Sequence, residues 1–322
     1  MQKIFTLVAI MGAGFGLASA QQNGSQVNVG NSFPGKFVTG ITMDEGYGSS
    51  ANSVLNYNDA RQLISVDNNY GNFYTERIEF GYTGGTIDGR TYDMTISEID
   101  EDDEIMIYIK IENGVAVSAY SISKDTYETE TEDWSFAYDK EGHLTEVKRS
   151  QDDSNSTITL EYKDGAVISV TSVENDLEDN TTETSVSTFT YNDMLENTCG
   201  LMLFDGLYNA DLDEMDVAYM AGVLGKPARY LPNSCKDEED TVNFQWTFTS
   251  DGYVESLIMT CDDEKETANF KWGTTSGVND ITIDNENGSQ VWYDLQGVRR
   301  QGPTKGLNIV RDADGTVRKV ML

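Results

Sequence analysis

Histidine is almost absent from this chain, which has a single one among its 322 residues. A Ser-His-Asp triad could therefore be built only around His143. Since His143 follows Gly142 in an expected hairpin turn, we interpret it as a surface residue. The chain also lacks a glycine-rich phosphate loop and a dinucleotide fingerprint. The sequence predicts no catalytic, cofactor-binding or metal-binding residue and no cofactor, so we expect a protein that is not an enzyme.

Basic side chains are scarce: 22 Lys and Arg stand against 55 Asp and Glu, for a formal net charge of -33. Such a polyanion repels nucleic acid and anionic lipid headgroups, so we expect neither as a partner. The acids cluster between expected strands, at 98–104, 128–133, 174–179 and 237–240. We interpret the clusters as solvated loop tips that keep a sheet with many edges in solution. Calcium is the alternative, but no cluster follows the calcium-loop pattern.

Long hydrophobic runs are missing beyond the N-terminus, where nothing approaches the roughly 20 apolar residues of a spanning helix. Residues 1–20 combine a basic start, an apolar stretch and the small residues Ala18-Ser19-Ala20, a pattern typical of a secretory signal peptide. Gln21 follows the expected cleavage site, so no lipid-bearing cysteine is predicted. We expect an exported protein that is periplasmic, on the outer-membrane surface or extracellular.

Cysteine occurs three times, at Cys199, Cys235 and Cys261. An odd number leaves at least one thiol free, although an exported protein can form disulfides. Cys235 and Cys261 flank an expected hairpin and are the best-placed pair for a bridge. The spacing matches neither a zinc ribbon nor a redox Cys-x-x-Cys motif.

One phrase recurs along the chain: an aromatic or aliphatic strand end, then Asp or Asn, often Gly, and then a new alternating run. Asn-Gly and Asp-Gly between such runs are the strongest short-range hairpin signal, because they reach positive φ at little cost. The copies are Leu55–Asp59, Ile111–Val115, Phe136–Gly142, Leu160–Gly165, Phe189–Asp193 and Trp246–Gly252. The repetition predicts a long antiparallel sheet built hairpin by hairpin.

The expected strands alternate between an apolar face and a face of Thr, Ser and charge, which is typical of a half-buried antiparallel sheet. Ile105, Ile107, Ile109 and Ile111, for example, share one face. The pattern changes once, where Leu212, Met215, Tyr219, Gly222 and Val223 recur at helical spacing, after a cap at Asn209 or Asp211 and before Gly225 and Pro227. We expect this helix to pack on the sheet or to plug its mouth.

These patterns predict a mainly β protein: an antiparallel hairpin-repeat sheet that forms a curved or closed barrel-like domain with one helix, plus a small C-terminal β module. The expected parts are a signal peptide (1–20), an irregular lead-in (21–50), the β domain (51–272), a linker (273–290) and a tail (291–322). From residue 299 onward the tail is basic, so it can dock on the acidic body or act as an export address.

Two resemblances accompany these patterns. Trp292–Arg299 followed by Pro303–Val310 resembles the C-terminal tail of exported Bacteroidales proteins and the sorting module of the type IX secretion system, which implies the secretion machinery as a partner. The body resembles a Bacteroidales domain family of unknown function described as having a porin-like fold. The residues that carry this second resemblance are Tyr138–Leu144, Tyr162–Val167, Asp213–Met215, Ala218-Tyr219, Gly222, Leu224–Lys226 and Leu231-Pro232.

Tyrosine and tryptophan provide the best functional signal, because exposed rings suit sugars and peptide side chains. The same rings can instead stabilise a sheet through cross-strand pairs. Our leading hypothesis is a secreted, acidic, non-enzymatic binding protein for a glycan, a peptide or an envelope partner. The alternatives are an outer-membrane-associated barrel and a glycan-active enzyme that uses two carboxylates.

Overall fold

The computed structural model describes residues 35–273 except 45–49, 71–74, 100–103, 125–128, 211, 213–214, 239 and 263, together with short strands beyond residue 290. The expected signal peptide and most of the expected linker lie outside the described residues. The chain divides into two compact units, Met1–Gly277 and Val278–Leu322. The second unit forms a four-stranded sheet in the order β20-β19-β21-β22, from Arg299–Arg300, Val291–Tyr293, Leu307–Arg311 and Val317–Met321.

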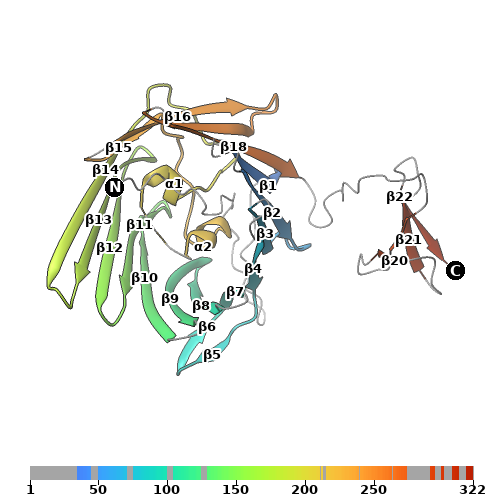
Figure 1. Cartoon of the computed structure of the whole chain (residues 1–322), viewed down its shortest axis with the longest axis horizontal. Helices are drawn as coiled ribbons and strands as arrows, with labels where there is room; N and C mark the ends of the chain where they lie inside the picture. The colour runs from blue at the N-terminus through green and yellow to red at the C-terminus, as the bar shows by residue number, and fades with distance from the viewer. Residues whose placement is uncertain are drawn as a thin grey trace. The chain divides into compact units, whose positions relative to one another are not determined.

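The first unit is a closed antiparallel barrel of 16 strands, which confirms the predicted fold class (Figure 1). Neighbours along the chain are neighbours in the sheet, as a series of hairpins requires. The barrel strands are β1 (Phe37–Asp44), β2 (Ser50–Tyr57), β3 (Leu63–Asn69), β4 (Thr75–Gly81), β7 (Met94–Ile99), β8 (Glu104–Glu112), β9 (Val115–Lys124), β10 (Thr129–Tyr138), β11 (Leu144–Ser150), β12 (Ser154–Lys163), β13 (Ala166–Asp176), β14 (Thr181–Thr190), β15 (Ser234–Lys236), β16 (Thr241–Phe248), β17 (Val254–Cys261) and β18 (Glu264–Gly273). A small ribbon, β5 (Gly85–Ile87) and β6 (Arg90–Tyr92), lies between β4 and β7.

The barrel closes where its first and last strands meet. β1 pairs with β18 from Phe37↔Gly273 to Asp44↔Thr267. Residues 37–44 belong to the expected irregular lead-in, but they form a strand with one bulge between Val38 and Gly40. This strand pairs with its chain neighbour β2 on one side and with β18, more than 200 residues away in the sequence, on the other, and no local pattern predicts the second pairing.

The recurring phrase marks one rim of the barrel. Five of its six copies form turns at this rim. The turns join β2 to β3 (58–62), β8 to β9 (113–114), β10 to β11 (139–143), β12 to β13 (164–165) and β16 to β17 (249–253). At Asn113-Gly114 and Asp164-Gly165 both turn residues have positive φ, as a type I′ turn requires. We call this rim the base rim, and the opposite rim, which carries the hairpin tips, the far rim.

In three copies of the phrase, a tyrosine closes the hairpin that precedes it. Tyr57 lies at the end of β2 and donates its hydroxyl to the Val38 carbonyl at the start of β1, 2.9 Å away. The same bond, from the second strand of a hairpin to the start of the first, recurs around the rim: Tyr82 to Leu63 (2.8 Å), Tyr138 to Ala116 (2.7 Å), Tyr191 to Val167 (2.7 Å) and Trp272 Nε1 to Val254 (2.6 Å). Tyr57, Tyr138 and Tyr191 belong to copies of the recurring phrase, whereas Tyr82 and Trp272 form the same aromatic clamp outside it.

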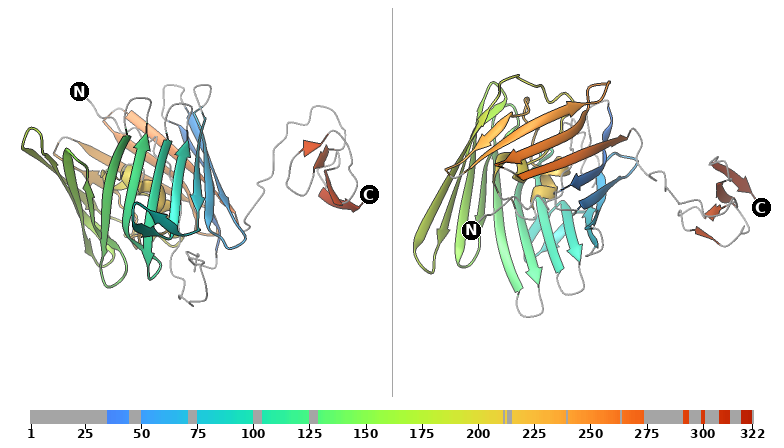
Figure 2. Two further views of the ribbon diagram at one scale, coloured as in Figure 1. Left: turned by 90° about the horizontal axis from the view of Figure 1, so that it is seen from below. Right: turned by 45° about the horizontal axis from the view of Figure 1, so that its top comes forward.

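The copy at Phe189–Asp193 is the exception, and our prediction of a hairpin there is wrong. After Tyr191 the chain leaves the wall, and it returns only at β15. We call residues 195–231 the plug, since Figures 1 and 2 show its helices inside the ring of strands. Its apolar residues belong to the same buried cluster as the inward side chains of the wall. The plug thus replaces one short turn and fills the interior of the barrel toward the base rim.

The plug contains two short helices among its described residues, α1 (Asp205–Tyr208) and α2 (Asp216–Met220), where we predicted one. The α2 helix ends earlier than expected, because Gly222 takes φ +76° and the Val223 N–H turns back to the Ala218 carbonyl. Asp211 lies outside the described residues, and the side chain of Asn209 binds Ser187 and Asp237 instead of capping a helix. No described helix is long and apolar enough to cross a membrane.

The return of the plug to the wall is held by backbone hydrogen bonds to the base-rim turns. The Lys226 N–H donates to the Gly142 carbonyl at 2.9 Å, and the Arg229 N–H donates to the Gly165 carbonyl at 2.8 Å. Gly225 permits this approach: a Cβ at this position would lie 2.7 Å from the Gly142 oxygen. The plug is therefore fastened to turns that the sequence repeat creates.

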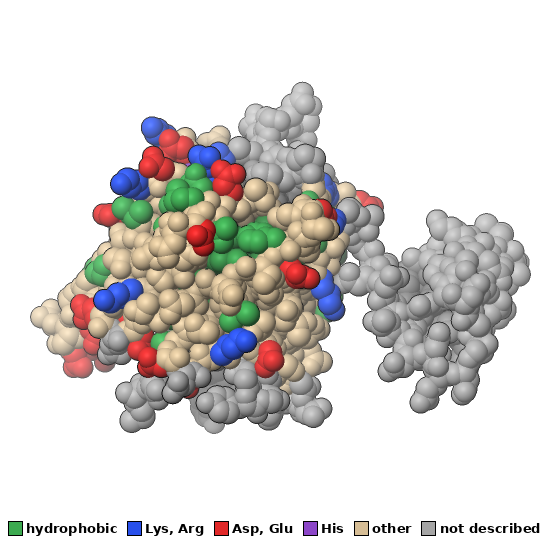
Figure 3. All heavy atoms as spheres, turned by 90° about the horizontal axis from the view of Figure 1, so that it is seen from above, with side chains coloured by type: hydrophobic (Ala, Val, Ile, Leu, Met, Phe, Trp, Pro, Cys, Tyr) green, Lys and Arg blue, Asp and Glu red, His purple; other side chains and the backbone are tan. Residues whose placement is uncertain are grey.

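The wall is apolar inside and polar outside. On β10, Trp134 and Phe136 are buried while Thr131, Asp133 and Ser135 are exposed, and on β16 the buried Phe244 alternates with the exposed Asn243 and Gln245. Figure 3 shows one face, on which charged side chains of both signs are scattered and apolar side chains form small patches among uncharged polar side chains and backbone. The alternation predicted from the sequence places its apolar face toward the plug.

All three cysteines are free, so the predicted Cys235–Cys261 bridge is wrong. Cys235 pairs with Val242 on β16, and β17, which carries Cys261, lies on the other side of β16. Cα atoms on two strands with a third strand between them lie about 9–10 Å apart, whereas a disulfide needs Cα atoms within about 7 Å. The two thiols share a face, but one strand separates them.

Candidate functional site

A pocket of about 330 Å³ opens at the base rim, where the plug enters and leaves the barrel. Its lining comes from Glu196, Asn197, Thr198, Lys226, Pro227, Ala228 and Arg229. Neither half of this lining was singled out as a site from the sequence, since the halves lie about 30 residues apart along the chain. Gly225 and Pro227, which we interpreted as a helix end, were the only local signal for the second half.

The polar groups of this pocket are already engaged with the chain itself. The Asn197 Nδ2 donates to the carbonyls of Leu201 and Ala228, and the Lys226 Nζ donates to the Glu141 carbonyl. Arg229 pairs with Glu196 at 3.0 Å. These bonds hold the plug in place. Since the charged side chains of the pocket already have partners in the chain, the pocket offers a ligand neither a positive nor a negative surface.

The lone histidine locks a turn. Its Nδ1 lies 2.9 Å from Asp139 Oδ2, and its ring stacks on Tyr162 at 4.8 Å between centroids. The other oxygen of Asp139 accepts the N–H groups of Gly142 and His143. Burial acts to raise the pKa of Asp139, but these hydrogen bonds outweigh it and hold the pKa below its ordinary value.

Asp139, Glu141 and His143 offer ligand atoms within 4.8 Å of one another, so this turn is the described cluster that could hold a metal ion. Both oxygens of Asp139 already accept hydrogen bonds within the turn. A metal ion would have to displace these hydrogen bonds. The arrangement fits a turn-stabilising role. His143 lies in a turn as expected, but its side chain is only 12% exposed, so its interpretation as a surface residue is wrong.

Toward the far rim, the inward positions become polar. Glu132 is buried on β10, beneath the acidic tip of its hairpin, and pairs with Arg149 of β11 at 2.6 Å. The Arg149 guanidinium also lies 5.3 Å from the ring centre of Trp134. A buried carboxylate is costly without a cation, so this pair carries a large share of the local electrostatic energy.

Replacing Arg149 with alanine is expected to lower the free energy of unfolding by about 3 kcal/mol, because Glu132 stays buried without its cation. Denaturant unfolding monitored by circular dichroism measures the change. Lys148→Ala is the matched control: Lys148 is adjacent but exposed, and its pair with Glu146 should be worth less than about 1 kcal/mol. Equal losses in the two variants would contradict this assignment.

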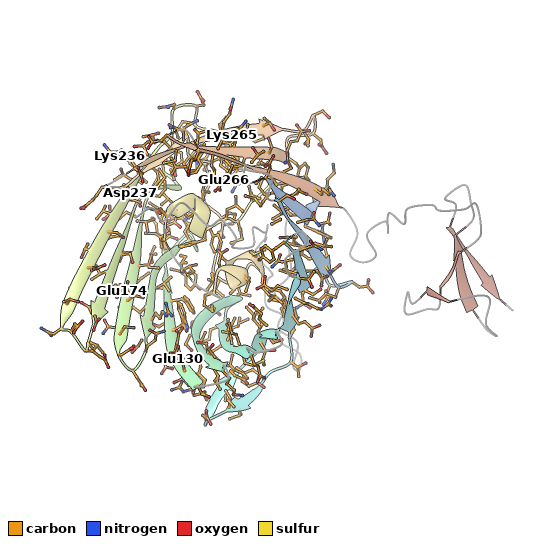
Figure 4. All side chains as sticks on the ribbon, viewed as in Figure 1. Glu130, Glu174, Lys236, Asp237, Lys265 and Glu266 are labelled. Carbon is orange, nitrogen blue, oxygen red and sulfur yellow. The ribbon has the colours of Figure 1, made fainter. Side chains whose placement is uncertain are left out.

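Four further acids of the wall lie on or next to different strands. Figure 4 labels Glu130 on β10, Glu174 on β13, Asp237 after β15 and Glu266 on β18, and these positions are separated by intervening strands. The carboxyl groups of a glycosidase lie about 5–10 Å apart. These four acids do not form such a pair with one another, whereas Glu174 and Glu183 are direct neighbours across β13 and β14. The two-carboxylate enzyme remains a prediction.

The aromatic residues that looked like ligand platforms are mostly structural where their contacts are described. Tyr57, Tyr138 and Tyr191 use their hydroxyls as clamps, and Phe204 packs edge-on against Tyr208 and Tyr219 within the plug. The alternative of sheet stabilisation therefore accounts for these rings. Sequence alone could not separate the two roles, because both use the same residue types.

Comparisons with known proteins give a fold and no family. No family model matches the chain, and no curated protein does. Among solved structures, the chain is similar to a porin-like protein from Bacteroides uniformis ATCC 8492, with a TM-score of 0.52 and 16% sequence identity. The similarity covers 73% of this chain and 96% of that protein. The chain therefore shares a porin-like barrel fold.

Proposed function

We propose that this chain is an exported, non-enzymatic binding protein that works in the aqueous space of the envelope or outside the cell. One observation carries the proposal: the strands turn polar side chains outward and bury apolar ones against the plug. A membrane-spanning barrel needs the reverse, an apolar band facing lipid around a polar lumen. A filled barrel offers its surface, not a channel, to a glycan, a peptide or an envelope partner.

Export through residues 1–20 and recognition of the tail 291–322 by secretion machinery belong to the same proposal. Both rest on the sequence patterns described above. The resemblance to a Bacteroidales family of unknown function is consistent with this setting.

An outer-membrane barrel is the second candidate, and the porin-like fold favours it. The outer face of the wall lies in water in the first proposal and in lipid in the second. Thr159 and Glu161 of β12 and Asn269 and Lys271 of β18 are exposed on the outer face. In the second candidate these side chains would have to face hydrocarbon, where a charged group at the bilayer midplane costs about 2–4 kcal/mol.

Fractionation separates the two. The full chain is expressed in a Gram-negative host, and the proposal expects the protein to be released from the envelope by osmotic shock, or found in the medium, without detergent. A chain lacking residues 2–20 is the control, and it should stay inside the cell. Sedimentation of the full chain with the outer membrane, with release only by detergent, would favour the barrel that spans lipid.

A further inference from the structure

The wall of the barrel has a step at β14. This strand, Thr181–Thr190, pairs with β13 from Thr181↔Asp176 to Thr188↔Ser169. On its other side it pairs with β15 only over Thr188–Thr190, because β15 is a strand of three residues. In Figures 1 and 2 the yellow-green hairpin of β13 and β14 lies at the outer margin of the barrel. Within the described residues, the edge of β14 over 181–187 has no strand beside it.

The backbone groups on this edge can be assigned. The Thr190 carbonyl accepts the Asn233 N–H on the β15 side. Since the N–H and C=O of alternate residues point to the same side of an antiparallel strand, those of Thr182, Thr184 and Val186 face the open edge. All three residues are exposed. The edge therefore presents a row of donors and acceptors spaced for another strand.

Of the devices that usually protect such a strand, the edge has an inward-pointing charge at Glu183 but no lysine, proline or bulge. Protected edges are short or carry lysine, proline or a bulge, whereas the edge-facing residues here are two threonines and a valine, and the pairing with β13 runs without a register shift. Exposed apolar side chains also gather on this hairpin: Leu177 is 54% exposed, Val186 39% and Ile168 37%. A strand laid on the edge would cover Val186.

The charge around the edge selects the occupant. Glu174, Asp176, Glu178, Asp179 and Glu183 lie on this hairpin, and none of its residues from 166 to 190 is basic. Lys236 is the nearby exception, beside Asp237 and Glu238 at the tip of the neighbouring hairpin. Two copies of the chain joined edge to edge would bring these acids together, which costs energy. A basic strand would meet an opposite charge.

We propose that the open edge of β14 binds an extended, lysine- or arginine-bearing peptide segment of another protein by β-strand addition. The backbone of Thr182, Thr184 and Val186 would supply the hydrogen bonds, and Glu183 on the inner face would select basic side chains. The inference rests on the proposed binding role and names its partner class. It does not depend on where the protein resides, so the fractionation result and the result below can fail separately.

The probe is a short blocked peptide that alternates lysine with valine, so that lysines lie beside Glu183 and valines beside Val186. Hydrogen exchange of the full chain is measured with and without it. We expect new protection at the amides of Thr182, Thr184 and Val186, and no binding by a matched peptide with glutamate in place of lysine or with N-methyl groups on alternate residues. No added protection at these amides with millimolar peptide would overturn the proposal.

Two variants test the edge itself. Thr184→Pro removes an edge-facing N–H without removing a bond to β13, as proline on an edge strand allows, and should weaken binding about tenfold. Thr184→Val keeps that N–H and should bind as the parent chain does. Glu183→Lys changes only a side chain and should weaken the lysine peptide in favour of the glutamate peptide. Circular dichroism checks that each variant folds.

A second copy is the competing occupant, and sedimentation velocity detects it. A dimer that forms with concentration and is lost in Thr184→Pro would show that the edge pairs with itself, which overturns the choice of a basic partner. A monomer that binds the lysine peptide supports it. Equal binding by Thr184→Pro and Thr184→Val would also overturn it, because the backbone would then not carry the contact.

Discussion

Replacing Phe204 with alanine is expected to lower the free energy of unfolding by about 3–5 kcal/mol. Phe204 is 1% exposed and lies between the two helices of the plug, 5.5 Å from the Tyr208 ring and 5.2 Å from the Tyr219 ring. The variant loses the buried ring and both edge-on contacts, and it leaves a cavity between the plug and the wall. Denaturant or thermal unfolding of the full chain measures the loss.

Phe248→Ala is the matched control for that experiment. Phe248 ends β16 and is 36% exposed, so the same truncation should cost less than about 1 kcal/mol there. If the two variants lost equal stability, the plug would not be part of the core. A large loss for Phe204 alone supports a barrel whose interior is closed by its own chain.

Raising the pH above about 10 is expected to unfold the protein cooperatively, because buried tyrosines cannot ionise in the folded state. Burial is the main cause of a raised pKa at Tyr57, Tyr82, Tyr138, Tyr162, Tyr191, Tyr208 and Tyr219. A raised pKa in the folded state gives stability that is complete below the unfolded value of about 10 and is lost as the pH rises past it.

The loss of stability at high pH is large because several buried tyrosines contribute to it. Each contributes about 1.4 kcal/mol for every pH unit above 10, so a few of them at pH 12 match the roughly 5–15 kcal/mol that holds a typical domain together. The absorbance of these seven tyrosinates should therefore appear only as the β signal in circular dichroism is lost. Ionisation of all 17 tyrosines near pH 10, with the β signal intact, would contradict the burial of the clamps.

The local turns and the period of the strands could be predicted from the sequence, and the long-range contacts could not. Asn113-Gly114 and Asp164-Gly165 predict their turns because these residue types adopt the required positive φ angles at little cost. The same signal at Tyr191 leads into the plug, since an aromatic clamp ends a hairpin whatever follows it. Whether a short turn or a long insertion comes next is decided by residues further along.

The candidate sites also divide into those set by local sequence and those set by long-range contacts. The lock between His143 and Asp139 spans one turn, and the sequence already placed His143 there. The open edge of β14 depends on the length of β15, more than 40 residues away, and on closure of the barrel between β1 and β18. The free thiols of Cys235 and Cys261 likewise depend on which strand lies between them. Such features arise from the order of strands in space and leave no local pattern.

Native-state thiol labelling tests the filled barrel most directly. Cys235 faces inward on β15 and is 3% exposed, and burial raises its pKa to about 12. Cys199 is buried in the plug, and Cys261 is only partly covered. With a maleimide at neutral pH, followed by mass spectrometry, we predict that Cys261 reacts first and that Cys199 and Cys235 react only when the chain unfolds. Modification of Cys235 as fast as Cys261 in the folded protein would mean that the barrel is hollow, contrary to this account.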